Sequence, residues 1–197
     1  MQTLDAQIAH FAPELRATLG LTGEATLKVA TTVGAELRFL TVEAKNEILA
    51  ATPIDSSARL EEIVVFQAFM DQVHAMRKPH PATIRAQVVY QNYVCFVYLG
   101  ESLFRVLAKS PPTCPLSRKC ARFLTDNPVR AFRNALAHGN WKYREDFTGL
   151  VFWARKGSDK NEPLSEFQVD QRTLSFWQVL TRGIAYSAYQ HLRTGAG

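Results

Sequence analysis

Residues Asn127 to Trp141 read NPVRAFRNALAHGNW and predict one short helix with both of its ends marked. Asn127 is suited to cap the helix, and Pro128 fits its first turn, where the missing N–H costs nothing. Gly139 is the residue type that ends helices in the left-handed conformation. The apolar residues between these signals recur at spacings of three and four: Val129, Phe132 and Leu136. One face of the helix should therefore pack on a core.

The end of this helix should present a guanidinium, an amide and an imidazole close to solvent. Arg130, Asn134 and His138 are spaced by four residues and share a stripe, which Arg133 flanks. Arg133 and His138 are five residues apart, which is roughly 140° around an ideal helix. One chain need not bring both onto one small target, whereas a two-fold axis places two copies of the motif side by side. The spacing therefore favours a homodimer with a composite site.

These residue types suit the handling of a phosphate group. A guanidinium such as that of Arg133 binds phosphate through paired hydrogen bonds and stabilises the charge of a pentacoordinate phosphorus. His138 can take up and release a proton near neutral pH, and Asn134 can orient a neighbouring group. No carboxylate cluster that could hold magnesium lies near them in the sequence. This inventory is typical of RNA cleavage by acid–base catalysis without a metal or other cofactor, in which the 2′-hydroxyl is the nucleophile.

The positive charge of the chain is concentrated around this motif. The net charge is +5. The stretch from Arg118 to Lys156 holds nine basic and three acidic residues, whereas the rest of the chain holds fourteen and fifteen. A basic patch attracts polyanions, and nucleic acid is the commonest polyanion in a cytoplasm. The alternative is a solvated basic face that only aids solubility.

Aromatic and basic residues beyond the motif are candidates for contacts with RNA. Trp141, Tyr143 and Trp153 could stack on exposed bases of single-stranded RNA. We expect Trp153, which falls in a predicted strand, to belong to the core instead. Basic side chains would hold phosphates without reading the base sequence. The residues predicted to bind RNA are Arg130, Trp141, Lys142 and Arg144.

The chain reads as one mainly helical domain over residues 1–197. Its 47% hydrophobic content is enough for a sizeable core. A small β-hairpin is expected at about 149–170, from the segments GLVFWARK and EFQVD. The first half of 24–51 is rich in Thr and Val, so a strand is the alternative there. Helices are predicted over 5–19 (with a break at Pro13), 24–51, 56–76, 82–109, 115–125 and 171–193.

The cysteines and the apolar runs predict the cellular location. The three cysteines are odd in number, and Cys95 lies in an apolar run, which favours a buried, reduced thiol. The N-terminal residues lack the uninterrupted apolar stretch of a signal peptide. The most apolar run, 88–107, contains too many polar residues to span a bilayer and predicts a central helix. We therefore expect a cytoplasmic protein that does not bind a membrane.

The string RNALAH, from Arg133 to His138, resembles the R-x4–6-H signature of the HEPN superfamily, in the form with a polar residue after the arginine. The resemblance implies a HEPN-like helical bundle that dimerises through its motif helices. It also implies a metal-independent endoribonuclease, often a toxin or defence effector, for which an antitoxin protein is a candidate partner. Carried onto this chain, it makes Arg133 and His138 the catalytic pair and Asn134 the supporting polar residue. The predicted hairpin resembles that of small stand-alone HEPN proteins.

Other functions stay open on the sequence. Many HEPN domains have lost activity and bind RNA or nucleotides, or serve as protein-interaction domains. In a purely structural alternative, Arg133 forms a salt bridge and His138 caps carbonyl groups at the helix end, where a cation is favoured.

Overall fold

The computed structural model describes residues 4–22, 80–109, 115–146, 148–157 and 159–193, together with isolated positions between 24 and 76. This part of the chain is mainly helical and contains one small antiparallel sheet, which confirms the predicted class. The helices predicted over 24–51 and 56–76 fall outside the continuously described ranges. No helix in the described ranges is long and apolar enough to cross a membrane.

The N-terminal helix is interrupted, as Pro13 predicts. α1 spans Leu4–His10, and α2 (Ala12–Glu14) continues into a π-helical turn, η1 (Leu15–Leu19). Proline has no N–H to donate to the preceding turn, so it is tolerated at the start of a helix. Here Pro13 lies in the first turn of α2.

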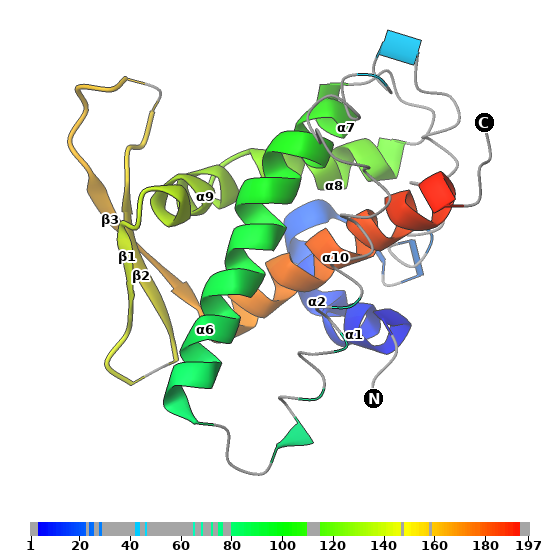
Figure 1. The fold of residues 1–197 in the computed structure, drawn as a ribbon. Coiled ribbons are helices and arrows are strands. Elements are labelled where there is room, and N and C mark those ends of the chain that lie inside the picture. Colours follow the sequence, from blue (N-terminus) through cyan, green and yellow to red (C-terminus); the bar gives the residue numbers. More distant parts are fainter. Residues whose placement is uncertain are drawn as a thin grey trace.

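One long helical rod runs through the middle of the molecule (Figure 1). Its parts follow one another without interruption: α6 (Pro81–Asn92), η2 (Tyr93–Tyr98), η3 (Gly100–Phe104) and α7 (Arg105–Lys109). His80 caps the start of the rod, because its Nδ1 accepts a hydrogen bond from the N–H of Ala82 at 3.2 Å. The rod confirms the helix predicted over 82–109. α8 (Pro115–Thr125) and α10 (Gln171–Arg193) likewise have the predicted bounds.

The motif lies on α9 (Val129–Ala137), and its predicted cap is wrong. α9 begins one residue after Pro128, and the side chain of Asn127 donates instead to the carbonyl of Lys156 at 3.5 Å. The N–H of Arg130, at a position where a capping side chain would accept a hydrogen bond, donates instead to the carbonyl of Asp126 at 2.8 Å. A backbone turn thus replaces the asparagine cap.

The sheet has three antiparallel strands in the order β1–β2–β3. The predicted hairpin is confirmed as β2 (Gly149–Ala154) and β3 (Ser165–Asp170). A further strand that the sequence did not reveal, β1 (Trp141–Tyr143), pairs with β2 directly after the motif. The labelled helices lie on one side of this sheet in Figure 1. The residues that alternate onto the helix-facing side of β2 are buried: Leu150, Phe152 and Ala154.

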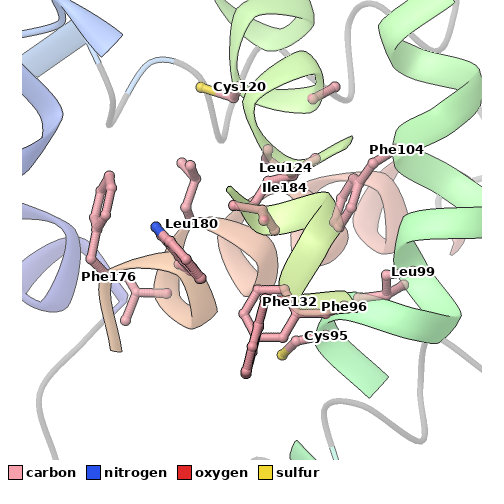
Figure 2. Packing of buried hydrophobic residues seen from close by; sticks show 14 of the residues in the cluster. Cys95, Phe96, Leu99, Phe104, Cys120, Leu124, Phe132, Phe176, Leu180 and Ile184 are labelled. Carbon is pink, nitrogen blue, oxygen red and sulfur yellow. The ribbon is translucent and has the colours of Figure 1, made fainter. Parts of the chain in front are cut away.

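Phe132 lies where the layers of the molecule meet. Its side chain is fully buried, and its ring packs against Phe96 of η2, Phe152 of β2 and Trp177 of α10. The three distances between ring centres are 5.4, 5.2 and 5.8 Å. Figure 2 shows Phe132 beside Phe96 within the buried cluster. One aromatic side chain therefore ties the motif helix to the rod, the sheet and the C-terminal helix.

Replacing Phe132 with alanine should lower the free energy of unfolding by about 3–5 kcal/mol, because it removes a buried ring and leaves a cavity. Chemical denaturation followed by circular dichroism measures this. Arg130→Ala, an exposed substitution on the same helix, is the matched control and should change the free energy of unfolding by less than about 0.5 kcal/mol. Equal effects of the two substitutions would contradict the central place given to Phe132.

Candidate functional site

α9 ends in a fully hydrogen-bonded turn that presents His138. The N–H of Gly139 donates to the carbonyl of Leu136 at 3.2 Å, and the N–H of Asn140 donates to that of Ala135 at 2.8 Å. These two bonds form a Schellman motif, which requires a residue in the left-handed conformation. Gly139 adopts it with φ of 69°, so the predicted helix stop is confirmed. His138 stands immediately before this turn, with its side chain exposed.

Arg133 is held by a carboxylate from the central rod. Its Nη2 forms a salt bridge with Oε1 of Glu101 in η3, and both side chains are partly buried. Glu101 also bonds Arg105, one turn further along the rod, at 3.4 Å. Burial lowers the pKa of the Arg133 guanidinium from its ordinary value, although arginine remains a cation at neutral pH. The salt bridge therefore fixes a positive charge on the side of α9 that faces the rod.

The structure brings Arg133 to Glu101 rather than to His138. Asn134 and His138 are exposed, and the N–H of His138 donates to the carbonyl of Asn134 at 3.2 Å as part of the helix. Within the described residues, the side chains of Asn134 and His138 form no hydrogen bond or ion pair. In this single chain, the rod therefore orients the guanidinium while the imidazole faces solvent.

The residues predicted to bind RNA have different surroundings. Arg130 is exposed on α9. Arg144 is half-buried and bonds Asp146 at 3.3 Å. Hydrogen bonds from Thr148 hold the pKa of the Asp146 carboxyl below its ordinary value, and Arg144 adds to this effect. Trp141 is half-buried and packs on the core, with its ring edge against Tyr143 at 5.5 Å. Of the four residues, Arg130 and Lys142 are exposed, whereas Trp141 and Arg144 are half-buried.

Lys142 and Trp153 form a pair on the opposite face of the sheet from the helices. Lys142 is exposed, and its Nζ lies 5.6 Å from the centre of the Trp153 ring. Trp153 is only half-buried, so the expectation that it belongs to the core is wrong. The reason is register: Phe152 points toward α9, and the next residue along β2 must point the other way.

Glu101 is the residue at this site that sequence reasoning missed. It is one of the polar residues that interrupt the apolar run 88–107. The segment ESLFR, from Glu101 to Arg105, has the i, i+4 spacing of a helical ion pair. That spacing explains the pairing with Arg105. It could not reveal Arg133, which lies on another helix.

Neither a metal-binding cluster in the described residues nor a related protein gives further information about this site. The described residues contain no group of three or more His, Cys, Asp or Glu side chains that could hold a metal ion. Comparisons with protein-family models, with curated proteins and with solved structures found no match for this chain.

The left-handed turn at Gly139 should be sensitive to any side chain. No atom lies within 4 Å of the position that a Cβ would occupy, so Gly139→Ala creates conformational strain without a clash. We expect it to cost about 1–2 kcal/mol in the free energy of unfolding. Gly139→Asn should cost less, because asparagine tolerates this conformation better. Thermal unfolding of the two variants measures the difference, and equal losses would contradict the role of the turn.

Proposed function

We propose that this protein is a metal-independent endoribonuclease of HEPN type that acts as a homodimer. The observation that carries the proposal is the placing of the two motif residues. His138 is exposed at a hydrogen-bonded helix end, while the Arg133 guanidinium is oriented by Glu101 from the rod. An exposed imidazole and an oriented cation, carried by the same short helix, are the groups that proton transfer around a phosphodiester requires. A role as a toxin or defence effector, with an antitoxin protein as a partner, belongs to the same proposal.

In the proposed reaction the nucleophile comes from the substrate. His138 takes the proton of an RNA 2′-hydroxyl as its oxygen attacks the neighbouring phosphorus. The bond from phosphorus to the 5′-oxygen of the next nucleotide breaks, and that oxygen receives a proton from an imidazolium. The products are a 2′,3′-cyclic phosphate and a 5′-hydroxyl. Arg133 stabilises the charge on the phosphorane oxygens, and Asn134 orients the phosphate.

A second copy of the chain accounts for the separation of the two catalytic side chains. Arg133 is turned toward Glu101 and His138 toward solvent, so one chain supplies an acid–base group and a cation that do not meet. In a two-fold dimer, the motif helix of the second copy would lie beside the first. His138 of each chain could then act with the other, one as base and one as acid. Residues from both chains would complete the site.

The salt bridge also favours a second candidate, a catalytically silent module that binds RNA. In that case the pairing of Arg133 with Glu101 serves stability alone, as in the structural alternative drawn from the sequence. The basic stretch from Arg118 to Lys156 would then provide salt-sensitive binding without cleavage. An activity assay separates the two functions.

Purified protein should cleave single-stranded RNA in the presence of EDTA and leave 2′,3′-cyclic phosphate ends. His138→Ala should reduce the rate by at least about a hundredfold, because it removes the group that transfers protons. Denaturing gel electrophoresis with end-group analysis measures both. His10→Ala, at another exposed histidine, is the matched control and should cleave like the wild type. Unchanged cleavage by His138→Ala would refute the proposed function.

Glu101→Gln keeps the size of the side chain and removes the charge that orients Arg133. We expect kcat to fall roughly tenfold to a hundredfold, because the guanidinium is no longer held in place, while KM for RNA changes less. Arg105→Gln removes the other partner of Glu101 and should leave kcat near that of the wild type. If Glu101→Gln lowers the unfolding temperature but leaves kcat unchanged, Glu101 has only a structural role.

A further inference from the structure

The solvent face of the sheet carries an aromatic ring and a cation close to the motif. Strand register places Lys142 and Trp153 on the face opposite Phe152, whose ring packs on α9. The Nζ of Lys142 lies 5.6 Å from the centre of the Trp153 ring. Neighbouring positions on this face are the polar, exposed Glu166 and Gln168 of β3 and the buried Val151 of β2. The Trp153 ring is thus the large aromatic group on a face whose exposed strand residues are polar.

A backbone hydrogen bond ties this surface to the end of the motif helix. The N–H of Trp153 donates to the carbonyl of Asn140 at 2.9 Å, and Asn140 follows His138 by two residues. Two residues of chain reach at most about 7 Å, and paired strands lie about 5 Å apart. The Cα atoms of Trp153 and His138 are therefore separated by no more than about 12 Å. A phosphate at His138 would have its neighbouring nucleotide within reach of the ring.

We propose that Trp153 and Lys142 form a subsite for one base of single-stranded RNA, next to the phosphate that is cleaved. The position of that phosphate rests on the proposed function. The face of an indole ring stacks on any base, and an ammonium group contacts phosphate without base preference. Lys142 has a flexible side chain, which can leave the ring for the phosphate of the stacked nucleotide. Paired bases in a duplex are already stacked, so the subsite selects single-stranded RNA.

Binding of an uncleavable probe tests the subsite independently of catalysis. A short single-stranded RNA with 2′-O-methyl groups lacks the nucleophile, and fluorescence anisotropy measures its affinity. Trp153→Leu should weaken binding about tenfold, because it removes the stacking surface, whereas Trp153→Phe should retain most of the affinity. Tyr186→Leu makes the same type of change at an exposed position on α10 and should bind like the wild type. A duplex of the same sequence should bind wild type and Trp153→Leu equally.

A second measurement leaves Trp153 in place, in case its replacement prevents folding. In the Trp141→Phe variant, the remaining tryptophans are Trp153 and the buried Trp177. Adding the probe should quench the fluorescence of Trp153. Absence of quenching, or wild-type affinity in a folded Trp153→Leu variant, would overturn the subsite even if cleavage is observed. Binding that depends on Trp153 without any cleavage would support the subsite and contradict the proposed ribonuclease.

Discussion

The arrangement of the described elements depends on the burial of Phe132. This one side chain contacts the central rod, the sheet and α10, so α9 cannot rotate about its axis without losing all three contacts. Because the packing fixes the rotation of α9, it also fixes which residues of the motif meet the rod and which meet solvent. Arg133 follows Phe132 directly and lies at the edge of the buried face, where it meets Glu101. The orientation of the candidate site is therefore a consequence of core packing.

The end of α9 adds a second constraint, since a helix that frayed there could not hold His138 in place. The Schellman bonds close the last turn, and Asn140 continues directly into pairing with β2. The imidazole is thus attached to backbone that is hydrogen-bonded on both sides, although the side chain itself faces solvent. An exposed side chain on a fixed backbone is a suitable arrangement for a group that exchanges protons with a bound substrate.

The sequence predicted those features that depend on local signals. The bounds of α8 and α10, the glycine stop at Gly139 and the hairpin follow from proline, glycine and apolar periodicity, which act within a few residues. The prediction failed where a distant backbone group decided the outcome. Asn127 does not cap α9, because the carbonyl of Asp126 already accepts the N–H of Arg130 in the first turn. β1 is only three residues long, and its pairing with β2 is what makes it a strand.

The residues of the candidate site also divide into those that local spacing predicts and those that depend on contacts between distant segments. Arg133, Asn134 and His138 could be selected because their spacing on one helix is visible in the sequence. Glu101 could not, because its contact with Arg133 joins two helices that are separated along the chain. For Trp153 the strand itself was predicted. The face that its ring occupies depends on the register of β2 against β1 and β3. The sequence does not reveal that face, because most residues of β2 are apolar and show no alternation of polar and apolar positions.

The salt bridge between Arg133 and Glu101 is compatible with phosphate binding by the same guanidinium. A partly buried cation without a partner would be destabilising, so a carboxylate beside it is required on physical grounds. A guanidinium has five N–H donors, and one carboxylate can accept at most a bidentate pair of them. Donors on the outer edge of Arg133 therefore remain for phosphate oxygens. In this arrangement Glu101 sets the direction of the guanidinium before RNA arrives, and the conformational entropy of the arginine side chain is lost during folding rather than during binding.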